Sequence, residues 1–203
     1  MSRLRTRPTR DDTREKLFEA AARVFEEQGI GGASIETIAA AAGFSRGAFY
    51  SNFTSKDELI IAMLENHVEQ SILRLHDLLA KHKSLPDFID ALKTMDRSQQ
   101  DPLGRSPLLH MEMILFVARA EKRRPELAKR LRARRKLIAD IVETTAKNSG
   151  KDSVLDPAWW GAIVLAMEDG FRLHRLIDPE TTPSDSFLRA ISDLQRAIGA
   201  ASA

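Results

Sequence analysis

The side chains that would face outward from a short helix between residues 45 and 52 are suited to contact DNA. Phe49 and Phe53 lie four residues apart and share the inward face of such a helix. The outward face then carries Arg46, Gly47, Ala48, Tyr50, Ser51 and Asn52. Arginine can pair with guanine, asparagine with adenine and hydroxyls with phosphate oxygens, while small residues let the backbone approach closely. These residue types predict a helix that reads the major groove.

Two helices joined by a tight turn must position this face. Ser34 predicts the N-cap of the first helix, because its hydroxyl can accept from the free amides of the next turn. The apolar face of that helix is formed at helical spacing by Ile35, Ile38, Ala39 and Ala42. Gly43 is expected to end it with a positive φ, and Ser45 to cap a reading helix that runs through Phe53. The stretch from 34 to 56 is therefore predicted to be a helix-turn-helix.

Further polar side chains border the predicted reading face. They are suited to hold phosphate oxygens through hydroxyls or an ammonium group. They are Ser34, Thr37 and Lys56, which with Tyr50 are expected to hold phosphates; Ser45 completes the predicted DNA-binding set. Within the whole DNA-binding set, Arg46 is expected to contact a base, with Gly47 and Ala48 allowing the close approach.

Residues 10 to 62, roughly, closely resemble the DNA-binding domain of TetR-family transcriptional repressors. The resemblance rests on Leu17, Ala20, Ala21, Val24, Phe25 and Gly29, on Ser34, Ile38, Ala39 and the turn Ala42-Gly43-Phe44-Ser45, and on Gly47, Phe49, Tyr50, Phe53, Ser55, Lys56, Glu58 and Leu59. It implies a homodimer on palindromic double-stranded DNA, with a C-terminal domain that binds a small-molecule effector. By this resemblance, the effector shifts the helix that begins at Ser55 and so releases the operator.

The remaining signals predict an all-α protein of about nine helices, because apolar residues recur at helical spacing and no strand pattern is present. A first helix begins at residues 11–13, and a long helix runs from Ser55 to about Ala80. Prolines divide the rest into helices near 86–98, 105–120, 124–148, 156–177 and 184–200. The predicted domains are a disordered basic arm (1–10), a helix-turn-helix domain (11–56) and a ligand-binding and dimerisation domain (57–203).

The charge balance gives only weak support for DNA binding. The chain has a formal net charge of +2, but residues 11–60 hold five basic and nine acidic residues, a net charge of −4. Affinity for DNA must therefore depend on where the charges lie. The basic arm at 1–10 is expected either to reach along DNA or to be a solvated tail. The basic segment 122–136 is either a second nucleic-acid surface or, as we favour, a solvated helix face.

Two predicted helices of the C-terminal half carry Met, aromatic and His side chains that adapt to irregular ligands. The candidate ligand-binding residues are His110, Met113, Phe116, Trp159, Met167, Phe171 and His174. The same stripes fit an ordinary helical core, and part of each is expected to be core. The effector is expected to be largely apolar.

The last two predicted helices are suited to pack against a second copy of the chain. Their small and apolar residues are Gly161, Ala162, Leu165, Ala166, Gly170, Leu173, Phe187, Ile191, Leu194 and Ile198. Gly170 inside a helix costs about 1 kcal/mol relative to alanine, which a close helix approach would explain. A homodimer through these helices is favoured because a single reading helix contacts too few base pairs. Packing within one subunit is the alternative.

The sequence carries no enzyme signature. Its five histidines form no metal-binding or catalytic pattern, and no glycine-rich phosphate loop follows a strand. There is no cysteine, which excludes disulfides and thiolate metal sites, and no apolar run approaches the roughly 20 residues that span a bilayer. We expect no catalytic residue, metal site, cofactor or membrane contact, and a cytoplasmic location.

These patterns favour a sequence-specific DNA-binding transcriptional regulator, a repressor that a small-molecule ligand releases from its operator. A second hypothesis is an all-helical small-molecule-binding or interaction protein in which the helix-turn-helix is only a packing unit. A third is an architectural DNA binder whose affinity depends on salt and not on sequence.

Overall fold

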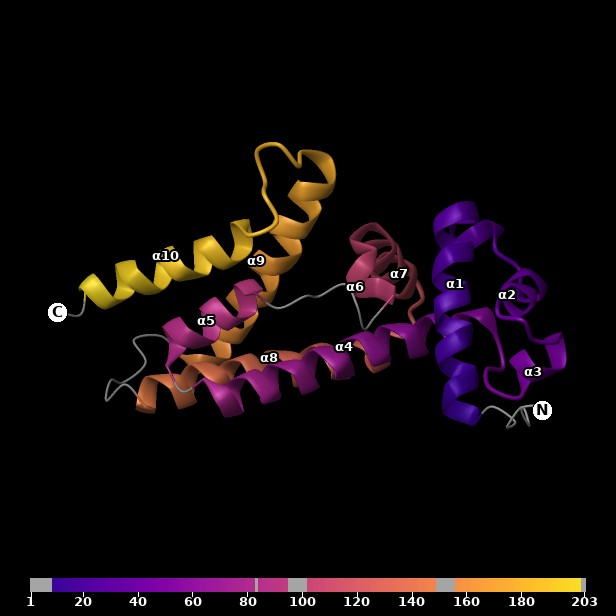
Figure 1. Ribbon diagram of the computed structural model, residues 1–203, viewed down its shortest axis with the longest axis horizontal. Helices are drawn as coiled ribbons and strands as arrows, with labels where there is room; N and C mark the ends of the chain where they lie inside the picture. The colour runs from indigo at the N-terminus through magenta and orange to yellow at the C-terminus, as the bar shows by residue number, and fades with distance from the viewer. Residues whose placement is uncertain (1–8, 83, 95–101, 149–155, 202–203) are drawn as a thin grey trace, which may run out of the picture.

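The computed structural model describes residues 9–82, 84–94, 102–148 and 156–201. Within these ranges every regular element is a helix, which confirms the all-α prediction. The helices are α1 (Arg10–Gly32), α2 (Ile35–Ala41), α3 (Arg46–Tyr50), α4 (Lys56–Lys81), α5 (Leu85–Thr94), α6 (Pro102–Arg105), α7 (Pro107–Arg119), α8 (Arg124–Asn148), α9 (Pro157–Ile177) and α10 (Ser186–Ala201). Figure 1 shows α1–α3, which we call the head, at one end, with α4 and α8 running side by side through the middle.

Most of the observed helices span the residues that the capping residues and the apolar spacing of the sequence predicted. α8 spans the predicted residues, and α4 begins directly after Ser55, whose Oγ accepts from the amide of Glu58. The predicted helix at 105–120 corresponds to α7, which begins at Pro107, a residue without an amide hydrogen that is tolerated at the start of a helix; the short α6 before it was not predicted. The basic arm up to residue 8, and residues 95–98 of the predicted helix near 86–98, lie outside the described residues.

A single apolar core joins the head to the body of the molecule. Phe25 of α1, Ile38 of α2 and Phe49 of α3 are each at most 1% exposed. Leu59 of α4 and Met113 of α7 belong to the same cluster of buried side chains. Because side chains on both sides of residue 56 share this core, the head and α4 pack as one unit; the division into domains at that point stays a prediction.

A cluster of buried and half-buried polar side chains, which we call the buried polar cluster, joins the four helices α4, α7, α8 and α9. His67 of α4 and His110 of α7 have ring centroids 4.4 Å apart. Arg172 of α9 places Nη1 3.1 Å from Nδ1 of His110. Glu168 of α9 pairs with Arg172 at 3.1 Å and with Arg134 of α8 at 2.7 Å. Since arginine has no acceptor, Nδ1 of His110 must accept, and the imidazole is neutral.

α8 and α9 approach each other closely at Gly161. A Cβ added there would collide with the main-chain carbonyl of Arg135 on α8. By contrast, nothing lies within 4 Å of a Cβ added at Gly170, the glycine for which the sequence suggested a close approach. Within one chain, the close helix approach is therefore at Gly161 and not at Gly170.

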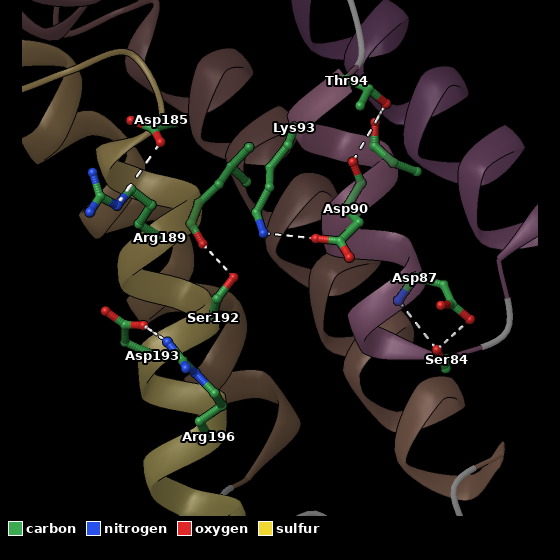
Figure 2. A network of polar contacts seen from close by, with 12 residues as sticks. Ser84, Asp87, Asp90, Lys93, Thr94, Asp185, Arg189, Ser192, Asp193 and Arg196 are labelled. Atoms are coloured by element: carbon green, nitrogen blue, oxygen red, sulfur yellow. Dashed lines mark hydrogen bonds and ion pairs between the residues drawn. The ribbon is translucent and has the colours of Figure 1, made fainter.

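α10 contacts α5 and α9 and is positioned by apolar burial. Leu188 of α10 and both Phe88 and Ile89 of α5 are buried. Figure 2 shows α10 on the left and α5 on the right, and each ion pair drawn there joins two residues of the same helix or its cap. The drawn ion pairs therefore brace the individual helices and do not tie one to the other.

Gly161→Ala is expected to destabilise the fold by about 1–3 kcal/mol, because the new methyl group forces α8 and α9 apart. Gly170→Ala is the matched control and is expected to leave stability unchanged or raise it by up to about 1 kcal/mol through helix propensity. Urea unfolding at one protein concentration measures both. Equal effects of the two variants would contradict the close contact at Gly161.

His110 should make stability fall in mild acid. Burial, the neighbouring His67 and the positive charges of Arg172 and Arg134 lower the pKa of His110 from 6.5 to about 2. The unfolded chain therefore binds a proton below about pH 6.5 that the folded chain does not. The stability contributed by the neutral ring is fully present above that pH and is lost as pH falls toward 2, by up to about 1.4 kcal/mol per pH unit.

Urea unfolding between pH 7.5 and 4.5 measures this slope. His110→Gln is expected to flatten it, and the same change at His174, which is exposed, is expected to leave it unaltered. A slope identical in wild type and His110→Gln would show that His110 titrates normally in the folded protein.

Candidate nucleic-acid interface

Two capped helices and a glycine turn position the reading face. Ser34 Oγ accepts from the amide of Thr37 at 3.0 Å, and Ser45 Oγ accepts from the amide of Ala48 at 3.2 Å. Gly43 lies between the helices with a φ of 74°. Both predicted caps and the predicted glycine turn are therefore confirmed. α3 ends at Tyr50, three residues earlier than the sequence suggested.

Arg46 lies at the first position of α3 with its side chain 62% exposed. Its Nη1 lies 2.8 Å from Oε1 of Glu36 on α2. Its Nη2 donates to the Tyr50 hydroxyl at 3.3 Å, and the guanidinium lies 5.4 Å from the centre of the Tyr50 ring. The hydrogen bond with Tyr50 and the nearby carboxylate of Glu36 raise the pKa of Arg46. The exposed guanidinium therefore carries a full positive charge.

The other outward residues of the predicted face are engaged with their own helix. Gly47 is exposed and Ala48 is half-buried. Ser51 Oγ donates to the Gly47 carbonyl at 3.0 Å, and Asn52 Nδ2 donates to the Ala48 carbonyl at 2.9 Å. Asn52 was expected to face outward, but it lies beyond the end of α3 and its half-buried side chain turns back. Pairing with adenine would require this side chain to rotate.

Lys56, the first residue of α4, binds main-chain carbonyls at the end of α1, a contact that we call the Lys56 clamp. Its Nζ donates to the carbonyl of Ile30 at 2.6 Å and to that of Ala33 at 2.8 Å. An ammonium group has three donors, so one remains for the phosphate contact that the sequence predicts. The hydroxyls of Ser34 and Thr37, also expected at phosphates, lie 2.8 Å apart and are hydrogen-bonded to each other.

The segment 52–54, directly after α3, is held from two sides. From α1, the Arg14 guanidinium lies 4.5 Å from the centre of the Phe53 ring and donates to the Asn52 carbonyl at 3.5 Å. From α4, Glu58 accepts from the hydroxyl and the amide of Thr54, and these hydrogen bonds lower the pKa of Glu58. The reading face is therefore connected to both α1 and α4 through residues 52–54.

Five of the nine cations in the basic segment 122–136 form ion pairs with acidic side chains. The ion pairs are Arg123–Glu126, Arg124–Glu121, Arg130–Glu65, Arg134–Glu168 and Lys136–Asp140. Charges that are already paired attract phosphate less. This arrangement favours the helix-face interpretation over a second nucleic-acid surface.

The predicted ligand-binding residues differ widely in exposure. His110 and Met113 are buried, Phe116, Met167 and Phe171 are half-buried, and Trp159 and His174 are exposed. None of the seven lines the open cleft between α1, α4 and the beginning of α8, whose walls include Arg14, Glu65 and Lys129. Ligand binding by these residues stays a prediction.

Sequence reasoning missed two features of the structure. Glu36 faces Arg46, but no spacing within one helix links them. The buried Arg134 could have been noticed, because it falls at helical spacing on the apolar stripe of α8 that contains Leu131 and Ile138. A cation on such a stripe indicates a buried ionic partner, here Glu168.

In the described ranges, no helix has the length and apolar character required to cross a bilayer. The same part of the chain contains no group of three or more His, Cys, Asp or Glu side chains arranged to hold a metal ion.

Residues 17–63 match the family described as "Bacterial regulatory proteins, tetR family". The chain is 36% identical over 91 residues to the HTH-type transcriptional regulator TtgR of Pseudomonas putida; the match covers 45% of this chain and 41% of that regulator, less than half of either. It is 28% identical over 188 residues to the HTH-type transcriptional regulator PksA of Bacillus subtilis, covering 88% of this chain and 85% of PksA.

The fold is similar to that of the transcriptional regulator FadR from Bacillus subtilis, whose crystal structure is in complex with stearoyl-CoA. The TM-score is 0.65 at 17% sequence identity, and the match covers 86% of this chain and 95% of FadR. The matched family segment contains α2, α3 and the parts of α1 and α4 that hold them. Residues 17–63, which contain the helix-turn-helix, therefore match the tetR family of bacterial regulatory proteins, and the chain is similar to two bacterial transcriptional regulators.

Proposed function

We propose that this protein is a homodimeric, sequence-specific DNA-binding transcriptional regulator. The observation that carries the proposal is the exposed guanidinium of Arg46, at the start of a reading helix whose following residues, Phe53 and Thr54, contact α1 and α4. Arginine is the commonest side chain to read guanine in the major groove, through O6 and N7. Gly47 and Ala48 next to it leave room for the backbone to approach, and the Tyr50 hydroxyl suits a phosphate oxygen.

An exposed apolar face on α9 supports the homodimer. The large apolar side chains exposed along this helix are Trp159, Leu173, Leu176 and Ile177. Exposed apolar surface of this kind marks an interaction site, and a second copy packing on α9 and α10 would cover it. Two-fold symmetry would then present two reading helices to a palindromic operator.

Regulation is proposed to run through α4. This helix begins at the Lys56 clamp in the head and reaches the buried polar cluster at His67. A small molecule that binds the body better in one position of α4 would shift the population of head positions and so the affinity for an operator. FadR, which has a similar fold, was crystallised in complex with stearoyl-CoA, a ligand with a long apolar chain. By analogy, the effector of this protein is proposed to be largely apolar, and the protein to be a repressor that this effector releases from its operator.

The alternative is an all-helical small-molecule-binding or interaction protein without specific DNA binding. The two functions are separated by selection from a pool of random DNA duplexes at fixed salt, followed by sequencing. A palindromic consensus supports the dimeric regulator. A folded protein that enriches no sequence overturns it, and indifference to sequence with strong salt dependence indicates an architectural binder.

Arg46→Ala is expected to weaken binding to the selected operator by about 1–3 kcal/mol, roughly 5- to 150-fold, with unchanged thermal unfolding because the side chain is exposed. Fluorescence anisotropy with a labelled duplex measures the affinity. Arg132→Ala removes the same charge from an exposed position on α8 and is expected to change affinity less than about twofold. Equal losses in the two variants would mean that only total charge matters, and would count against base reading by Arg46.

Lys56→Met is expected to lower the free energy of unfolding by about 1–3 kcal/mol, because the carbonyls of Ile30 and Ala33 lose a charged donor. If its third donor reaches a phosphate, as the sequence predicts, the slope of log affinity against log salt should also fall by about 1. Lys81→Met removes an exposed ion pair with Asp77 from the same helix and is the control for both measurements. Unchanged stability would argue against the clamp, and an unchanged slope would remove Lys56 from the DNA contacts.

A further inference from the structure

The guanidinium proposed to read a base is already held within the protein. Glu36 contacts it from α2 at 2.8 Å, and the Tyr50 hydroxyl accepts from it at 3.3 Å. The side chains of Glu36 and Arg46 are 55% and 62% exposed. The Glu36 carboxylate therefore lies on the surface that would face DNA, directly beside Arg46, the cation that is proposed to read a base.

Fold stability gives little reason for this pair. Ion pairs as exposed as this one contribute little to the free energy of unfolding. The first turn of α2 does favour an acid, through the helix dipole. That effect explains a negative charge at residue 36, but it does not require the carboxylate to contact α3.

The pair has a different consequence for phosphate and for base. A phosphate that approaches Arg46 brings a negative charge close to the Glu36 carboxylate, and the two anions repel. The edge of a guanine carries no net charge and presents two acceptors to the guanidinium, so it repels the Glu36 carboxylate less than a phosphate does. Arg46 has five N–H donors, so it can pair with guanine while it keeps its contact with Glu36.

We propose that Glu36 is a specificity-determining residue, which withholds Arg46 from backbone phosphates and so reserves it for a base edge. This inference rests on the proposed function, because it concerns how the reading face chooses among DNA sequences. The inference explains why Glu36 lies on the DNA-facing surface, where its negative charge weakens the attraction to DNA in general.

The test is Glu36→Gln, which keeps the size of the side chain and removes its charge. Affinity is measured on the selected operator and on a scrambled duplex of equal length, at several salt concentrations. For the scrambled duplex, affinity is expected to rise about 3- to 10-fold, and its salt dependence to steepen by about 0.9, the value for one added phosphate contact. Affinity for the operator should change less than about twofold, so the ratio of the two affinities falls.

Glu26→Gln is the matched control, because Glu26 is an exposed acid on α1. It is expected to leave the ratio of operator to scrambled affinity unchanged. If Glu36→Gln also leaves that ratio unchanged, the inference is wrong while the proposed function stands. A wild-type protein that shows no preference for any duplex would overturn both, and thermal unfolding of each variant confirms that the comparison is between folded proteins.

Discussion

The arrangement of the head depends on the burial of Phe49 and Phe53. A five-residue helix such as α3 is not stable in water, because nucleation costs more than one turn of hydrogen bonds returns. The rings of Phe49 and Phe53 lie 5.7 Å apart, and Phe18 of α1 lies 5.8 Å from Phe53. Arg14 covers the Phe53 ring from the α1 side. The direction of each outward side chain of α3 therefore follows from what these rings pack against.

α4 connects the packing of the head to that of the rest of the molecule. Its first residue, Lys56, holds the end of α1, its next turns lie in the shared core, and His67 joins the buried polar cluster. Close-packed cores and buried ionic clusters change between discrete arrangements and do not deform gradually. A ligand that altered the packing around His67 would thus have a defined mechanical route to the reading face (Figure 1).

Local charge and not total charge decides what this surface attracts. The segment with the reading helix is acidic in sum, yet its outward face presents Arg46 framed by Tyr50 and Glu36. The most basic segment of the described chain, at the beginning of α8, is the reverse case, since many of its cations are paired with acids. Ion pairs within the protein determine the charge that a binding partner encounters, and the amino-acid composition does not show which charges are paired.

The helices could be predicted from the amino-acid sequence because the interactions that define them join residues close together in the chain. Helical periods, the caps at Ser34, Ser45 and Ser55, and the positive φ of Gly43 all act within a few residues, so they identified the helix-turn-helix and most helix bounds. The contacts that give the site its character join residues far apart in the chain. Only the tertiary structure placed Lys56 on the carbonyl of Ile30 and Glu36 beside Arg46, because the packing angles between helices decide which side chains meet across them.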